Sequence, residues 1–106
     1  MHIQIVRADV VGLGNEEWNK AAKELAPAFA EAPGLLSKVW LTDPQTGRFR
    51  GGIYTWRDRQ AMESFAQSDL FKAVLSHPNL ANITATDYSV MEAPTRVTRG
   101  LAVVPA

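Results

Sequence analysis

The chain of 106 residues contains no cysteine. It therefore cannot form disulfides, thiolate zinc sites or iron–sulfur clusters, and it has no cysteine nucleophile. Eleven Lys and Arg balance eleven Asp and Glu, so the surplus of positive charge that favours nucleic-acid binding is missing. No apolar run approaches the roughly 20 residues of a membrane helix, and the first residues lack a signal-peptide pattern. We expect a cytoplasmic protein with neither a membrane nor a nucleic-acid partner.

Histidine is also scarce, since His2 and His77 are the only two. Two separate histidines without a spaced group of carboxylates do not make a metal site, so we expect no bound metal. His77 precedes Pro78 at the end of a predicted helix, where a cationic side chain suits the helix dipole. Imidazole is also the side chain best suited to move protons near neutral pH, so a capping and a catalytic role both stay open.

Length and composition predict one globular domain. A chain of 106 residues is too short for two domains, and 46% hydrophobic and 21% charged residues are ordinary proportions. We expect a single domain over residues 1–106. Its tail, residues 92–106, is predicted to add a short strand near Leu101–Val104 or to contact a partner subunit.

Periodicity and turn residues predict the element order β-α-β-β-α-β. Asn15 is expected to cap the first helix, Pro27 to kink or restart it, and Pro33–Gly34 to end it. Asp58 is expected to cap the second helical region, with a restart near Ser68. The predicted strands are 2–10, 35–42, 48–56 and 83–91, the predicted helices are 15–32 and 58–76, and 43–47 is a predicted turn.

This order is typical of the ferredoxin-like α+β fold, an antiparallel four-stranded sheet with both helices on one face. The other face is then bare, yet apolar residues occupy both alternations of the strands: Val6 and Ala8 point opposite to Ile3 and Ile5. A large apolar face marks an association site, and a symmetric dimer would bury it. We therefore expect a homodimer, a dimeric α/β barrel. Which alternation faces the helices is not set by the sequence.

Three patterns have ordinary structural explanations. Gly12-x-Gly14 stands between a strand and a helix like a dinucleotide fingerprint, but Glu17 replaces the third glycine and would repel phosphate. The segment 50–56 faintly resembles the third-strand motif of RNA-recognition domains, but its aromatics are shifted and the charge is balanced. The serines lack a nucleophile-elbow context.

The aromatic residues of the middle strands are the most informative group. Core and dimer packing is the ordinary role of such residues. If the strands alternate regularly, Lys38 and Trp40 share one face of their strand, and Tyr54 and Trp56 share one face of theirs. Each pair presents a polar tip beside a flat apolar surface, which suits a small planar aromatic ligand. The adjacent Gly51–Gly52 pair indicates a bulge or the close approach of another backbone or a ligand.

Four stretches together resemble the YdhR-like family of putative monooxygenases. They are Ala32-Pro33-Gly34, Lys38-Val39-Trp40, Gly51-Gly52-Ile53-Tyr54 and Met91-Glu92-Ala93-Pro94. The resemblance covers about residues 3–100. It implies a ferredoxin-like subunit that pairs face to face with a second copy, and a cavity between sheet and helices. Some relatives oxidise polycyclic phenols with O₂ and no metal or flavin, whereas others degrade haem with an Asn, a Trp and a His. Here the first strand offers Gln4 in place of Asn.

The resemblance favours a cofactor-independent monooxygenase that acts on a small planar phenolic or quinonoid compound. In this hypothesis Lys38 supplies a cation for the phenolate, Tyr54 and Trp40 orient the ring, and His77 is the base. Contacts to the substrate are expected from four further residues: Gly51, Gly52, Trp56 and Phe65. The alternatives are a non-catalytic ligand-binding or stress-response dimer with the same pocket, and an isomerase or decarboxylase of a small acid.

Overall fold

The structure is a computed structural model that describes residues 1–46 and 48–101. Within those residues the strands are β1 (His2–Val10), β2 (Leu35–Thr42), β3 (Phe49–Trp56) and β4 (Leu80–Ser89). The helices are α1 (Asn15–Ala30), α2 (Arg59–Ala66), α3 (Asp69–Leu75) and α4 (Glu92–Val97). None of these helices is long and apolar enough to cross a bilayer.

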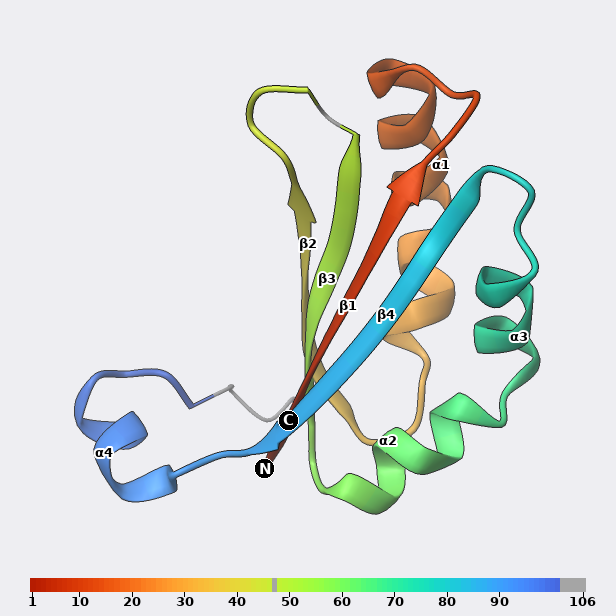
Figure 1. The fold of residues 1–106 in the computed structure, drawn as a ribbon. Coiled ribbons are helices and arrows are strands. Elements are labelled where there is room, and N and C mark those ends of the chain that lie inside the picture. Colours follow the sequence, from red (N-terminus) through yellow and green to blue (C-terminus); the bar gives the residue numbers. More distant parts are fainter. Residues whose placement is uncertain (47, 102–106) are drawn as a thin grey trace.

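The strands form one antiparallel sheet in the order β2-β3-β1-β4. Helices α1, α2 and α3 lie on one side of this sheet, whereas α4 lies on the other side, near the start of β1 (Figure 1). The predicted ferredoxin-like α+β fold is therefore confirmed.

Side-chain caps explain where two of the helices begin. The Asp58 carboxylate accepts the backbone N–H of Ala61 at 2.8 Å, and the Ser68 hydroxyl oxygen accepts that of Phe71 at 3.2 Å. Each cap satisfies a donor that the first helical turn leaves free. Both predictions are thus confirmed, including the break at Ser68 that divides the second helical region into α2 and α3.

The predicted start and interior of α1 need correction. Gly14 occupies its N-cap position without a side-chain hydrogen bond, and Asn15 is the first helical residue. The helix runs as one element through Pro27 to Ala30, so there is no restart at Pro27. Gly34 takes a positive φ of +79° at the return to β2, and a Cβ there would lie 2.5 Å from that of Ala61. Glycine is therefore required at that turn.

The C-terminal part also differs from the prediction. Strand β4 begins at Leu80, three residues before the predicted start, and the tail forms the short helix α4 (Glu92–Val97), which sequence patterns did not indicate. Leu101 is the last described residue of the predicted short strand, and Ala102–Val104 lie outside the described residues. Gly47 of the predicted 43–47 turn lies outside them as well.

The register settles which alternation faces the helices. Val6 pairs with Gly52, and Gln4 pairs with Tyr54. Val6 and Tyr54 belong to the same core cluster as buried aromatic residues of α1, α2 and α3, so this alternation faces those helices. Ile5 pairs with Ile53 on the opposite face. On that face, which α1 to α3 leave bare and α4 adjoins near the start of β1, four large apolar side chains are exposed by more than a third of their area: Ile5, Val39, Leu41 and Tyr88.

The core between sheet and helices is mostly aromatic. Phe65 of α2 is its centre, because its ring lies 5.1 Å from that of Trp56, 5.4 Å from Phe71, 5.9 Å from Phe29 and 6.0 Å from Tyr54, centroid to centroid. Tilted rings at such distances attract each other in addition to burying apolar area. Phe65 therefore packs the helices against the sheet and supports Tyr54 from behind.

We predict that Phe65→Ala destabilises the fold by about 3–5 kcal/mol, the usual cost of emptying a buried phenylalanine site. Denaturant unfolding at one fixed protein concentration measures this, with Val97→Ala as control because Val97 is 79% exposed. Equal stability of the two variants would contradict a central role for Phe65.

Candidate functional site

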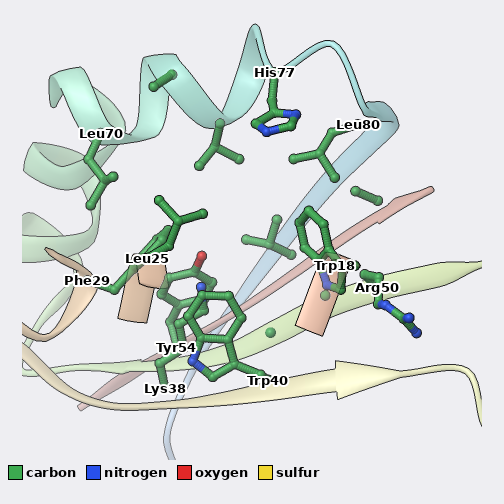
Figure 2. Close-up of a pocket in the computed structure, with 16 residues that line it drawn as sticks. Trp18, Leu25, Phe29, Lys38, Trp40, Arg50, Tyr54, Leu70, His77 and Leu80 are labelled. Carbon is green, nitrogen blue, oxygen red and sulfur yellow. The ribbon is translucent and has the colours of Figure 1, made fainter. Parts of the chain in front are cut away.

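A cavity of about 110 Å³ lies between the sheet and helices α1 and α3. Strands β2 and β3 supply one wall, with Lys38, Trp40 and Tyr54, and the end of α3 supplies the opposite side with His77 (Figure 2). The remaining lining side chains are mostly apolar: Val6, Ala8, Trp18, Leu25, Phe29, Leu70, Ala73, Val74 and Leu80.

Lys38 projects from β2 into a cage of three aromatic rings. Its Nζ lies 3.4 Å from the ring centroid of Trp40, 3.5 Å from that of Phe29 and 4.6 Å from that of Tyr54. No carboxylate of the described residues forms an ion pair with this nitrogen. A cation over a ring face gains about 0.5–2 kcal/mol, which does not replace the lost hydration of an ammonium.

Burial is therefore expected to favour the uncharged amine. It lowers the pKa of Lys38 from 10.5 to about 7, because the charged form loses its hydration without gaining a counter-ion. Near neutral pH, Lys38 is then divided between a free amine, which can accept a proton or attack a carbon atom, and an ammonium, which can pair with an anion. The sequence predicted only the ammonium, which pairs with an anion, and not the free amine.

Tyr54 holds its hydroxyl in the same cavity. Only 3% of the residue is exposed, and its ring stacks on that of Trp56 at 5.9 Å with an interplanar angle of 5°. The hydroxyl points away from β3 into the cavity (Figure 2). Desolvation raises the pKa of Tyr54, so this group stays protonated and acts as a hydrogen-bond donor.

The two glycines of β3 are needed for different reasons. A Cβ at Gly52 would lie 2.9 Å from Cε of Lys38, so the missing side chain leaves room for the lysine stem. A Cβ at Gly51 would lie 2.3 Å from the backbone oxygen of Val6, because β1 passes close at this point. The prediction of a close backbone approach is confirmed at Gly51. Both glycines line the cavity, as expected for substrate contacts.

Arg50 is a cavity residue that sequence analysis missed. Only 5% of it is exposed, and its guanidinium donates to the Asn15 amide oxygen at 2.8 Å and to the Thr42 hydroxyl. It lies near Trp18, on the far side of Trp40 from Lys38 (Figure 2). The alternation of β3 could have found it, since Arg50, Gly52 and Tyr54 share a face. Asn15 thus holds Arg50 and does not cap the helix.

His77 faces the cavity from the end of α3 (Figure 2). Its Nδ1 accepts the backbone N–H of Asn79 at 3.1 Å. A neutral imidazole that accepts at Nδ1 carries its proton on Nε2, so the ring presents a donor. This geometry favours His77 as a hydrogen-bond donor and argues against the base role expected for it.

Trp56 and Phe65 do not line the cavity. Trp56 is fully buried behind Tyr54, and its indole N–H donates to the Gln4 amide oxygen at 3.2 Å. Phe65 fills the core between α2 and the sheet. Both residues support Tyr54 from behind, so the interpretation of them as ligand contacts is not carried into the proposal below.

The two glycines give a matched test of the site. We predict that Gly51→Ala costs about 1–3 kcal/mol of stability, because its methyl group would press on the rigid backbone of β1. Gly52→Ala is expected to cost less, since the flexible end of Lys38 can move aside. That movement should weaken the ring-current shift of the Lys38 Cε resonance in NMR spectra. Equal stability losses together with an unchanged Lys38 resonance would contradict this account.

Solved structures with the same fold cover most of the chain. A putative antibiotic biosynthesis monooxygenase from Deinococcus radiodurans superposes with a TM-score of 0.72 at 19% identity, covering 88% of this chain and 95% of that one. The haem-degrading MhuD of Mycobacterium tuberculosis, with two haems in its active site, gives 0.69 at 18%, covering 86% and 96%. A mutant form of SnoaB, a cofactor-independent oxygenase from Streptomyces nogalater, gives 0.66 at 17%, covering 87% and 95%.

At identities below 20%, these structures establish that the fold is shared, but their activities are not assigned to this chain. A search of curated proteins finds no match. The model of one family, described as putative mono-oxygenase ydhR, matches residues 5–101 of the chain. This match spans nearly the whole of the sheet and all four described helices, and the chain belongs to that family.

Proposed function

We propose that the protein is a cofactor-independent monooxygenase that oxidises a small planar phenol to a quinonoid product. The observation that carries the proposal is the Lys38 amine, held among three aromatic faces in a mostly apolar cavity, where no described residue supplies a counter-charge. An uncharged amine beside a dry, flat binding space is suited to deprotonating a phenol. The resulting phenolate is the form that O₂ oxidises most readily.

The size of the cavity limits the substrate. An apolar cavity of about 150 Å³ holds one benzene ring, and the cavity here has about 110 Å³. Pockets for drug-sized ligands enclose about 300–1,000 Å³. A single-ring phenol therefore fits best, whereas a larger ring system would extend through the mouth of the cavity.

Haem, which MhuD binds, fits these residues poorly. The cavity is small, and His77, the one histidine among its lining residues, presents an N–H because its Nδ1 already accepts from Asn79. The proposed reaction uses no step through haem.

In the first step, the Lys38 amine takes the phenol proton and becomes an ammonium that pairs with the phenolate. The walls formed by Trp40 and Phe29 keep water out, which strengthens this pairing. The Tyr54 hydroxyl, which stays protonated, and the His77 N–H are donors for the oxygen atoms of substrate and product.

In the second step, the phenolate transfers one electron to O₂, and the phenoxyl radical and superoxide combine at a ring carbon. The peroxide takes up the proton from Lys38. The ring carbon that carries the peroxide then loses its hydrogen as a proton while the O–O bond breaks, and the departing hydroxide takes up that proton and leaves as water. One oxygen atom remains on the ring as the new carbonyl, and the other leaves in the water. The sum is phenol plus O₂ giving quinone plus water, so the substrate supplies all the electrons.

We further propose that two subunits associate through the bare face of the sheet, as the sequence led us to expect. The four apolar side chains exposed there come from three strands: Ile5 from β1, Val39 and Leu41 from β2, and Tyr88 from β4. Apolar surface spread over a sheet face in this way is typical of an interface. Pairing two such faces would leave both cavities on the outer, helix-covered sides.

The role of Lys38 predicts a specific pH profile. Oxygen uptake with a panel of one- and two-ring phenols should rise with pH and level off above about 7, where the amine is free. We expect Lys38→Met and Lys38→Arg each to lower kcat by about 10²-fold or more, since both remove the base, and to lose the inflection near pH 7. An oxygen electrode measures this, with Lys72→Met on the exposed side of α3 as control.

Folding of the Lys38→Met variant is expected to be intact. An unfolded lysine holds its proton up to about pH 10.4, whereas folded Lys38 releases it near 7. Wild-type stability should therefore rise with pH between these values, and the variant should lack that rise. Wild-type oxygen uptake by Lys38→Met would refute the base role. Ligand binding without any oxygen uptake would favour the non-catalytic ligand-binding dimer.

The proposed interface predicts that Val39→Asp converts a dimer into a monomer of 11.6 kDa, because a carboxylate would be buried between the two bare faces. Native mass spectrometry and light scattering measure the change. Leu75→Asp is the control, since Leu75 is similarly exposed but belongs to α3 in the helix layer. A wild-type monomer, or dissociation by the control alone, would contradict this interface.

A further inference from the structure

Lys38 differs from the other three lysines of the chain. Lys20, Lys23 and Lys72 are exposed on helices, whereas Lys38 is partly buried on β2 and lines the cavity. Its nitrogen makes no hydrogen bond and no ion pair within the described residues, and it faces three rings. The amine therefore lines a space that a small ligand can occupy, with no protein group among the described residues engaging it.

We propose that Lys38 captures small aldehydes or ketones with an aromatic or apolar body, forming an imine in the cavity. This activity uses the same cavity as the proposed oxygenation but involves no oxygen. It also differs in ligand class, because it needs a carbonyl carbon and no phenolic hydroxyl.

The step balances with the groups at hand. The nitrogen lone pair attacks the carbonyl carbon, and the carbonyl π electrons move to oxygen. A proton passes from nitrogen to oxygen, which gives a carbinolamine. The nitrogen lone pair then expels the hydroxyl group, which takes up one further proton and leaves as water. The iminium nitrogen then releases its proton, so the sum is amine and carbonyl compound giving imine and water, with no oxidation or reduction.

The surroundings of Lys38 suit an imine. The burial that disfavours the ammonium also favours the neutral imine, and the protonated fraction, which cyanoborohydride reduces, lies over the faces of Phe29, Trp40 and Tyr54. The apolar walls exclude the water that would hydrolyse it. The Tyr54 hydroxyl points into the same space and stays protonated, so it is positioned to donate a hydrogen bond to the departing oxygen, while the proton itself comes from solvent.

The remaining cavity sets the size of the ligand. Leu70 and Val74 of α3 and His77 after it also line the cavity. Leu70 and His77 lie on the side opposite Lys38 (Figure 2). With about 110 Å³ in total, the cavity is smaller than one that holds benzene, so one ring is the most that we expect it to take. Benzaldehyde matches this space and offers a carbonyl for the amine, and benzyl alcohol is the matched ligand that cannot condense.

The test is reductive trapping of the whole protein under anaerobic conditions. Benzaldehyde and cyanoborohydride are added at pH 7, and the labelled lysines are located by peptide mass spectrometry. The free-amine fraction at that pH is about 10³-fold larger for an amine with a pKa near 7 than for an ordinary lysine. We therefore expect Lys38 to be benzylated at least about tenfold faster than Lys20, Lys23 and Lys72, since a less basic amine is also a weaker nucleophile.

Two comparisons sharpen the result. Benzyl alcohol should slow labelling of Lys38 and leave that of the exposed lysines and of the Met1 α-amine unchanged. Tyr54→Phe should slow labelling of Lys38 several-fold while the ring cage persists. Labelling of Lys38 no faster than that of the exposed lysines would overturn the proposal. Because this assay is anaerobic, Lys38 can be labelled even if the protein takes up no oxygen with phenols. Oxygen uptake can equally occur even if Lys38 is not labelled.

Discussion

The Lys38 nitrogen has three aromatic faces around it and no negative charge beside it from residues 1–46 or 48–101, and the chemistry of the cavity depends on this arrangement. Removing an ammonium from water is costly unless a counter-ion replaces the lost hydration. Ring faces recover only part of that cost. The free amine becomes accessible near neutral pH as a result, and both proposed activities use it, one as a base and the other as a nucleophile.

Two sets of aromatic residues hold this arrangement in place. Phe29, Trp40 and Tyr54 touch the nitrogen, while Trp56 and Phe65 pack behind Tyr54 and never reach the cavity. Tyr54 belongs to both sets, so packing of the core fixes the position of its hydroxyl. A site supported in this way can keep its geometry when the ligand leaves. The solved structures share the fold at under 20% identity, so the chemistry must come from such local residues.

Much of this site was predictable because strand alternation is a strict rule. It placed Lys38 with Trp40 and Tyr54 with Trp56, and pairing of β2 with β3 brought the two pairs onto one face. Alternation shows which face of the sheet a side chain lies on, but not how far along the strand the cavity extends. The sequence therefore predicts Trp56 as a ligand contact. It lies at the far end of β3, where α2 covers the sheet.

Other features depend on contacts between distant segments. Asn15 has the residue type of a cap, but it holds Arg50 from across the fold. His77 was expected as a base, and only its hydrogen bond from Asn79 reveals that it presents a donor. The lowered pKa of Lys38 also escaped prediction, because it depends on the absence of any nearby carboxylate among the described residues of the folded chain, which no local pattern encodes.

The most direct test is an NMR titration of the lysine side chains in protein labelled with ¹³C-lysine. The chain has only four lysines, so the Lys38 Cε resonance can be assigned by its loss in Lys38→Arg. The account predicts that this resonance titrates with a midpoint near 7, while Lys20, Lys23 and Lys72 keep ordinary lysine midpoints. Four lysines that all titrate above about pH 10, the ordinary range, would contradict it, because Lys38 would then be a fixed cation.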